Sequence, residues 1–315
     1  MENIVFSFSA VFPVFAVVAL GYILSRFHFF KQDFLDTANK FCYKIGFPVL
    51  LFYSIYSNRA DLAQYKDLLF FCFTALAALV LVSLIIVPLL VKENPRRGAV
   101  IQGLFRGDFI IYGYPIALNL FGSGGASATI VTAVVGIPVY NILAVIIMLI
   151  FAPKESNRPN ILSLLKSMVT NPPLVASILA LIFVWLNLPM PDLLDKTIGD
   201  FSKMVTPLAL LSLGGGLSFK SSRSNLRFLT PTLTFRLVVL PAVVTTLAAL
   251  MGFRGANLGA IALMFSVPNA AVGYIMAEEM HSDGELSAQL IVFSCAFGVI
   301  TLFILFFILR SLGLL

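Results

Sequence analysis

Long apolar stretches alternate with short polar connections along the whole chain. Each stretch approaches the length of about 20 residues that a helix needs to cross a bilayer. Because hydrocarbon offers no partners to backbone polar groups, each stretch is predicted to be a helix. We therefore expect an all-α polytopic membrane protein with ten transmembrane helices, at 4–25, 34–56, 66–91, 98–121, 127–151, 161–187, 200–219, 228–251, 255–279 and 286–312.

The composition supports a membrane protein and excludes several other classes. Of the 315 residues, 59% are hydrophobic and 11% are charged, whereas soluble domains have about 45–50% and about 25%. This balance excludes an ordinary cytosolic enzyme, a disordered chain and a nucleic-acid binder. The net charge of +6 does not indicate a nucleic-acid partner, because the basic residues lie between apolar stretches, as they do in membrane proteins.

The basic residues predict how the chain is oriented in the cell membrane. The odd-numbered connections hold eleven Lys and Arg residues, and the even-numbered connections with the two tails hold five. Cytoplasmic connections are the richer in basic residues, so both termini are expected to be extracytoplasmic. The eleven are Arg26, Lys31, Lys92, Arg96, Arg97, Lys154, Arg158, Lys166, Lys220, Arg223 and Arg227.

The two halves of the chain share features in the same order. Lys44 stands four residues before Pro48, and Lys203 stands four before Pro207. Arg-Gly-Ala opens both the fourth and the ninth segments, and these matches lie roughly 160 residues apart. An odd number of helices per half would turn the second copy over in the membrane, as in many secondary transporters. We expect two inverted five-helix repeats, at 1–152 and 161–315, joined by a cytoplasmic linker at 153–160.

The fourth and ninth segments are both interrupted near the middle of the membrane. Gly107-Asp108 and Pro268-Asn269 lie about ten and thirteen residues into their helices, or about 15–20 Å at 1.5 Å per residue. Proline removes a hydrogen-bond donor, and interrupted helices at corresponding positions of two halves indicate a transport site. Half-helix N-termini at such a crossing favour an anion such as a carboxylate.

Arg106 and Asp108 add two charges at this depth. Charged side chains inside the membrane normally face a cavity or a partner. Arg106 is expected to pair either with a substrate carboxylate or with Asp108, and Asp108 is a candidate carrier of a coupling proton. The residues predicted for the substrate site are Arg106, Gly107, Asp108, Tyr112, Asn141, Pro268 and Asn269.

Other polar residues in the apolar stretches have simpler interpretations. Asn171 is expected to restore hydrogen bonds around the prolines that follow it, whereas Asn141 could face a cavity. Lys44, Lys203 and Arg236 are expected to extend towards a membrane interface. The two G-x-x-x-G motifs, Gly103 with Gly107 and Gly255 with Gly259, favour close helix packing.

No signature of an enzyme or of a bound cofactor is present in the sequence. The chain has no G-x-S-x-G, H-E-x-x-H or G-x-x-x-x-G-K-[ST] motif. Cys42, Cys72 and Cys295 are widely spaced within apolar stretches, which predicts neither a disulfide framework nor a zinc site. We expect no catalysis, no metal and no cofactor other than a coupling ion, H⁺ or Na⁺.

Several stretches resemble the auxin efflux carrier family. Phe105 to Phe109, continuing through Gly113-Tyr114-Pro115, resembles the fourth helix of the family. Thr206 to Leu210 resembles its seventh helix, and Pro268 to Val272 resembles its ninth. The resemblance covers nearly the whole chain, and the short middle linker is similar to that of bacterial members.

The resemblance implies a fold and a class of substrate. Helices 1, 2, 6 and 7 would form a scaffold, helices 3–5 and 8–10 a transport unit, and two chains a homodimer. Substrates across the family are organic anions, which include auxin in plants and small carboxylates such as malate or malonate in bacteria. Asp108 departs from the Asn that relatives often carry, and its carboxylate would repel an anion unless it is protonated or paired with Arg106.

Three hypotheses follow. The first is a secondary active transporter that moves a small organic anion by alternating access at the crossing of helices 4 and 9. The second is a sodium-coupled carrier similar to the bile-acid symporters, in which Asp108, Asn141 and Asn269 would serve sodium. The third is a membrane receptor that binds a ligand on the same fold without transporting it. Uptake and its dependence on sodium would distinguish the three.

Overall fold

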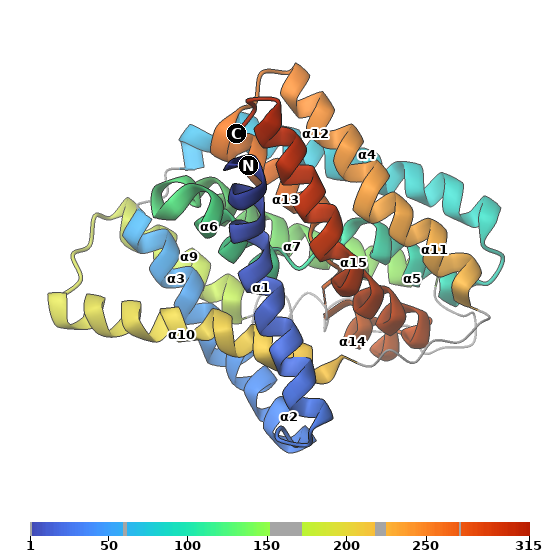
Figure 1. Ribbon diagram of the computed structural model, residues 1–315, viewed down its shortest axis with the longest axis horizontal. Coiled ribbons are helices and arrows are strands. Elements are labelled where there is room, and N and C mark those ends of the chain that lie inside the picture. Colours follow the sequence, from blue (N-terminus) through green and yellow to red (C-terminus); the bar gives the residue numbers. More distant parts are fainter. Residues whose placement is uncertain (1, 59–61, 152–171, 218–224, 271) are drawn as a thin grey trace.

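The computed structural model describes residues 2–58, 62–151, 172–217, 225–270 and 272–315, and nearly all of them are helical (Figure 1). The chain is an all-α membrane protein, as the apolar pattern predicts. Five spans of the described residues are long and apolar enough to cross a bilayer. They are α1 (Glu2–Arg26), α4 (Lys66–Leu90), α7 (Ser127–Ile150), the run from Leu226 to Leu250, and α15 (Gly284–Ser311).

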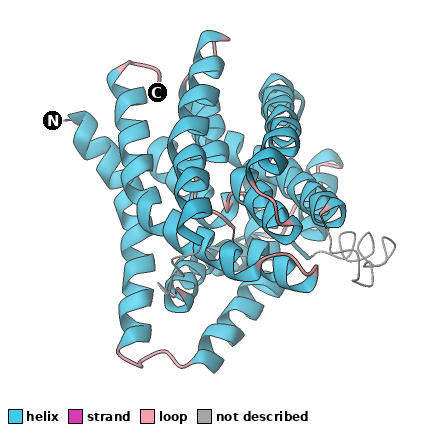
Figure 2. Ribbon diagram, turned by 90° about the vertical axis from the view of Figure 1, so that its right-hand side faces the viewer, coloured by secondary structure: helices cyan, strands magenta, loops and turns pink. Residues whose placement is uncertain are grey.

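Most of the other predicted segments are shorter or interrupted helices, whereas the predicted seventh segment lies in a continuous helix of 25 residues. The linker expected at 153–160, the start of the sixth segment and Asn171 lie outside the described residues. The run from Leu226 to Leu250 consists of α11 (Leu226–Thr234), η5 (Phe235–Val239) and α12 (Leu240–Leu250). Figure 2 shows that the described part of the chain is built of helices and loops. The remaining elements are α2 (Gln32–Phe41), η1 (Cys42–Gly46), α3 (Phe47–Asn58), η2 (Leu62–Tyr65), α5 (Asn94–Phe105), η3 (Phe109–Gly113), α6 (Tyr114–Gly125), α9 (Pro172–Trp185), α10 (Asp192–Gly216), α13 (Gly255–Ser266) and α14 (Val272–Glu279).

Three short π-helical turns have a local cause that is visible in the sequence. The segments η1, η3 and η5 are each followed, two residues later, by a proline: Pro48, Pro115 and Pro241. A proline has no N–H to donate, and its ring clashes with the carbonyl four residues earlier, which here lies inside the π-helical turn. The wider turn accommodates that carbonyl, and such turns are frequent at functional sites.

The most extensive helix contacts lie at the left and centre of Figure 1, where α1 packs against α10 and α3 packs against α9. Gly21 and Gly214 make the first contact possible. A Cβ atom on Gly21 would overlap the Leu211 carbonyl oxygen, and one on Gly214 would overlap the Val18 carbonyl oxygen. The two backbones therefore touch directly, as in helix pairs with small interfacial residues.

The most enclosed helices are the short ones. Every residue of α5 from Gly98 to Phe105 is buried, and so is every residue of α13 from Leu258 to Ser266. Both buried stretches lie within the main core, to which residues of α4, α7, α12 and α15 also belong. The chain places its two interrupted segments at the centre of the molecule.

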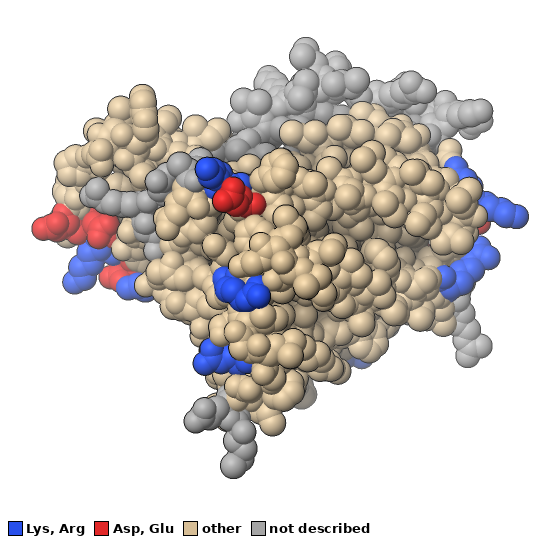
Figure 3. Space-filling view, turned by 90° about the horizontal axis from the view of Figure 1, so that it is seen from above, with Lys and Arg blue, Asp and Glu red and all other residues tan. Residues whose placement is uncertain are grey.

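The outside of the molecule is apolar, as a bilayer requires. Leu81, Ile85 and Leu89 of α4 are between 61% and 79% exposed, one turn apart on the same face. A stripe of this kind would be unfavourable in water. From above, most of the visible surface is uncharged, with the charged side chains in scattered small groups (Figure 3).

The two chain ends lie side by side at one end of the molecule (Figures 1 and 2). The Asn3 amide donates to the Ser311 hydroxyl at 3.2 Å, and the Arg310 guanidinium stacks over the Phe6 ring at 4.5 Å.

Candidate functional site

The two predicted interruptions meet each other at the centre of the molecule. Helix α5 ends at Phe105 and η3 starts at Phe109, while α13 ends at Ser266 and α14 starts at Val272. The residues around Gly107, between α5 and η3, form a first extended strand, and those around Asn269, between α13 and α14, form a second. The two strands cross as an antiparallel bridge that pairs Gly107 with Asn269. The breaks are therefore parts of one structure and not two separate kinks.

The backbone contacts across this bridge are reciprocal. The Asp108 N–H donates to the Pro268 carbonyl at 2.8 Å, and the Ala270 N–H donates to the Arg106 carbonyl at 3.2 Å. Each strand thus provides a hydrogen-bond partner for one backbone N–H and one backbone carbonyl of the other strand. A break in a helix would otherwise leave these backbone groups without partners.

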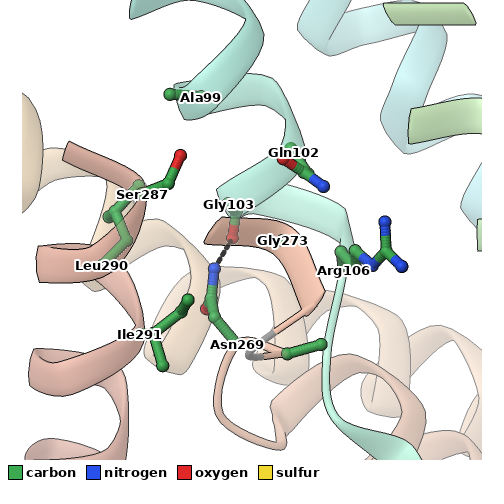
Figure 4. A pocket seen from close by; sticks show the side chains of 10 residues that line it. Ala99, Gln102, Gly103, Arg106, Asn269, Gly273, Ser287, Leu290 and Ile291 are labelled. Atoms are coloured by element: carbon green, nitrogen blue, oxygen red, sulfur yellow. Dashed lines mark hydrogen bonds between the residues drawn. The ribbon is translucent and has the colours of Figure 1, made fainter. Parts of the chain in front are cut away.

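Asn269 links the second strand to α5 and to α15 by hydrogen bonds. Its Nδ2 donates to the Gly103 carbonyl at 2.8 Å, drawn as the dashed line in Figure 4. Its backbone N–H donates to the Ser294 hydroxyl at 2.9 Å. The Oδ1 atom of Asn269 is buried and has no hydrogen-bond partner, so this amide retains one acceptor for another group.

Arg106 is buried, and its described contacts reach two other helices. Its Nη2 donates to Asn141 Oδ1 on α7, and its Nη1 donates to Met276 Sδ on α14 at 2.8 Å. In the orientation that suits both neighbours, the Gln102 amide donates to the Gly273 carbonyl at 3.2 Å and accepts from Arg106 Nη1 at 3.1 Å. Figure 4 shows the Arg106 side chain extending away from Asn269.

Asp108 begins the second half of the first interrupted segment. Its side chain accepts a hydrogen bond from the Ile111 N–H at 3.2 Å and so caps η3. A carboxylate is favourable at a helix N-terminus because the free N–H groups carry partial positive charge. This contact gives the carboxylate a structural role whether or not it also carries a proton.

A small pocket opens beside the crossing and has room for about one water molecule. Arg106 and Asn269 line it together with residues of α5, α14 and α15 (Figure 4). The hydroxyl of Ser287, also in the lining, is buried without a hydrogen-bond partner. The full lining is Ala99, Gln102, Gly103, Arg106, Asn269, Ala270, Gly273, Ser287, Leu290 and Ile291.

The predicted site residues take four different positions. Arg106 and Asn269 line the pocket, while Gly107, Asp108 and Pro268 supply the crossing backbone and Asn141 contacts Arg106. Tyr112 does not line the pocket. It is fully buried, its ring stacks on Phe15 at 5.2 Å, and its hydroxyl donates to Cys295 Sγ at 3.1 Å.

One expectation about packing is wrong, and another is confirmed in part, because Gly103, Gly107 and Gly259 pack closely against neighbouring side chains and Gly255 does not. Arg236 does not extend to an interface: it is 0% exposed and its guanidinium lies against the crossing strands. Gly255 packs against nothing within 4 Å of its Cβ position. It opens α13 with a φ of 55°, a backbone conformation that suits glycine. Lys44 and Lys203 are exposed, as expected.

Sequence reasoning missed Gln102, Ser287 and Arg236. Gln102 lies four residues before Arg106, so the two share one helix face, and this spacing was an available signal. Arg236 is a charge inside an apolar stretch, as Arg106 is, and the same rule about intramembrane charges applies to it. Ser287 has no distinctive sequence signal, because its role depends on where α15 packs.

The start of α5 is fixed to the loop before α15. The Ser282 hydroxyl donates to the Pro95 carbonyl at 2.6 Å, and the Asp283 N–H donates to the same oxygen at 3.2 Å. The Arg96 and Asp283 side chains form an ion pair at 3.1 Å. Among the described residues, no group of three or more His, Cys, Asp or Glu could hold a metal ion.

The chain matches a family described as membrane transport protein over residues 6–306. It belongs to this family. A protein named as an uncharacterized transporter in Methanocaldococcus jannaschii is 24% identical over 297 residues, which cover 92% of this chain and 94% of the relative. Another uncharacterized transporter, from Methanothermobacter thermautotrophicus, is 26% identical over 94% of this chain and 96% of its own length.

A plant relative carries the name that the motifs suggest. Auxin efflux carrier component 6 of Arabidopsis thaliana is 26% identical over 176 residues, which cover 55% of this chain and 29% of the plant protein. The resemblance to the auxin efflux carrier family is thereby confirmed. The chain is a membrane transporter, and its crossing strands lie inside the matched region.

Proposed function

We propose that this transporter is a secondary active carrier of a small organic anion, and that the anion binds where the two interrupted helices cross. The observation that carries the proposal is the reciprocal bridge between Gly107 and Asn269 beside a pocket that contains a buried Arg106. Helices broken at mid-membrane are a common way to build a transport site. A buried guanidinium suits a carboxylate, which it can bind through two parallel hydrogen bonds.

The polar groups of the pocket favour an anion that also carries a hydrogen-bonding group. Arg106 and Gln102 can both donate, and the Ser287 hydroxyl can donate or accept. Asn269 Oδ1 can only accept. A carboxylate bound by Arg106 would leave this carbonyl free for a donor on the same substrate. The present pocket holds about one water, so binding would have to accompany an opening of the crossing.

Two inverted five-helix repeats would explain the symmetry of the bridge. Exchanging 106 with 268 and 108 with 270 converts one backbone hydrogen bond into the other. The same offset of 162 residues relates Gly107 to Asn269. The close pairs α1 with α10 and α3 with α9 would also exchange under this relation, and they would form the scaffold of helices 1, 2, 6 and 7. A homodimer through this scaffold remains a prediction.

The orientation also belongs to the proposal, with both termini outside a plasma or inner membrane. A cysteine placed before Ile4 or after Leu315 should then react with an impermeant reagent on intact cells. Because the two ends lie together, both positions should give the same result. Labelling only after lysis would reverse the orientation, and labelling of one end alone would contradict an even number of crossings.

The substrate can be sought by thermal unfolding of the purified protein with mono- and dicarboxylates, with and without a hydroxyl. A ligand at 100 times its Kd should stabilise the protein by about 2.7 kcal/mol. Arg106→Gln should abolish this shift, whereas Asp108→Asn should retain it, because Asn caps a helix as well as Asp. Arg310→Gln, on an exposed guanidinium at the chain end, is the matched control.

The same variants separate a substrate role of Arg106 from a structural ion pair with Asp108. Breaking a buried pair destabilises by about 3–5 kcal/mol, so both single variants would fold poorly and the double variant Arg106→Gln with Asp108→Asn would recover. Recovery of folded yield in the double variant would assign Arg106 to the scaffold. A folded Arg106→Gln that no longer responds to the anion would support the site.

A further inference from the structure

Arg236 is a buried charge that the crossing site does not use. It lies in η5, between α11 and α12, and is 0% exposed. None of the ion pairs among the described residues includes it, and its Nε has no hydrogen-bond partner. Burying a charge is costly unless other groups compensate it, so the compensating groups must be dipoles.

Those dipoles are the C-terminal ends of both interrupted helices. Arg236 Nη1 donates to the carbonyls of Leu104 and Phe105 at 3.3 and 3.5 Å, in the last turn of α5. Its Nη2 donates to the carbonyl of Val267, the C-cap residue that directly follows α13, at 3.1 Å. The last carbonyls of a helix have no partners within it and carry partial negative charge. One guanidinium therefore neutralises two helix ends that face each other.

Broken transporter helices present such carbonyls to a coupling cation in other carriers, where Na⁺ or H⁺ binds to the half-helix C-terminal ends. Here a tethered cation already occupies this position. We propose that Arg236 is a built-in counter-cation that replaces a bound coupling cation at the crossing, so that this site requires no Na⁺. The part about coupling rests on the proposed transport function, and the part about charge balance does not.

Gly107 supports this assignment because it provides the space that the guanidinium occupies. A Cβ atom on Gly107 would overlap Arg236 Nη2, and it would come within 2.7 Å of Val267 Cγ2. The break in the first helix and the tethered cation thus depend on each other. The same residue that lets the strands cross also lets the cation reach both helix ends.

The direct test is chemical replacement of the side chain. Arg236→Ala, purified in detergent, should melt at least about 5 °C below the wild-type protein. Guanidinium or methylguanidinium at millimolar concentration should restore part of this loss, because the ion can enter the vacated position. The wild-type protein and Arg310→Ala should not respond. An Arg236→Ala protein with wild-type stability, or one that these ions leave unchanged, would overturn the proposal.

A second pair of variants covers the case in which Arg236→Ala does not fold. Arg236→Lys retains the charge with fewer donors, and Arg236→Met retains the volume without the charge. Folded yield should be higher for Lys than for Met if the charge matters. Equal yields, or a higher yield for Met, would mean that Arg236 only fills space and would overturn the proposal.

Sodium provides the last measurement. The melting temperature and the carboxylate binding of the wild-type protein should be the same in sodium chloride and in choline chloride. Arg236→Ala should gain a sodium-dependent stabilisation that the wild-type protein lacks. Sodium-dependent binding in the wild-type protein would overturn the coupling part. The wild-type protein could also fail to bind or move any anion while Arg236→Ala still shows the expected loss of stability and its recovery with guanidinium ions. That result would contradict the proposed transport function and would support the role of Arg236 as a counter-cation.

Discussion

The two strands that cross at the centre have the same backbone contacts and different side chains. Each donates one N–H to the other and accepts one in return. The first strand reads Arg106-Gly107-Asp108 and carries two charged side chains, whereas the second reads Pro268-Asn269-Ala270 and carries none. A symmetric framework therefore holds an asymmetric site.

The difference assigns separate tasks to the two strands. The first strand directs Arg106 to α7 and α14 and uses Asp108 to cap η3, and it needs a glycine because Arg236 lies against it. The second strand uses Asn269 to bind the backbone of α5 and the Ser294 hydroxyl of α15. The first strand carries the charged side chains, and the second strand is hydrogen-bonded to the neighbouring helices. Substitutions in the two strands should therefore affect the protein in different ways.

The largest effect is expected for Gly107→Ala in the first strand. The added Cβ would collide with the Arg236 guanidinium and with Val267, so the crossing could not close and folded yield should fall sharply. Overpacking a filled interior costs about 1–3 kcal/mol or more. Gly124→Ala is the control, because nothing lies within 4 Å of its Cβ position. Equal yields in a detergent-stability assay would show that the strands can separate without harm.

Asn269→Leu in the second strand should remove transport while folded protein remains in the membrane. The leucine cannot donate to the Gly103 carbonyl, and an unsatisfied buried acceptor costs about 1–3 kcal/mol. Asn119→Leu removes a similar amide-to-carbonyl bond, to Ala10 at 2.9 Å, far from the crossing, and should keep transport. Uptake into proteoliposomes compares the two. Normal flux in Asn269→Leu would show that the second strand is only a kink in its helix and has no role in transport.

The smallest effect is expected for Ser294→Ala, which tests how the second strand is attached to α15. The Asn269 N–H would lose its acceptor, at a cost of about 1 kcal/mol, and the melting temperature should fall by about 2–4 °C. Anion binding should survive. Ser83→Ala is matched, since this buried hydroxyl bonds only to Leu79 one turn earlier in its own helix. Identical melting temperatures for the two variants would show that the strand does not need α15.

The sequence alone determined the features that depend on local rules. The apolar stretches predict the helices because their lengths match the bilayer. Gly107 and Pro268 predict where two of them break, because glycine and proline disturb the hydrogen bonds of their own helix. The prolines after η1, η3 and η5 are also a local signal for the wider turns, because each ring would clash with the carbonyl four residues earlier.

Only the tertiary structure decided where the polar side chains point. Arg106 and Arg236 look alike in sequence, because each is a basic residue inside an apolar stretch. The structure places Arg106 beside a pocket and Arg236 against two helix ends. Tyr112 belongs to the same motif as Arg106, but it packs against Phe15 and Cys295. These partners lie between about 30 and 180 residues away along the chain. Which partner a buried charge meets depends on how distant helices pack, and the local pattern of residues does not contain that information.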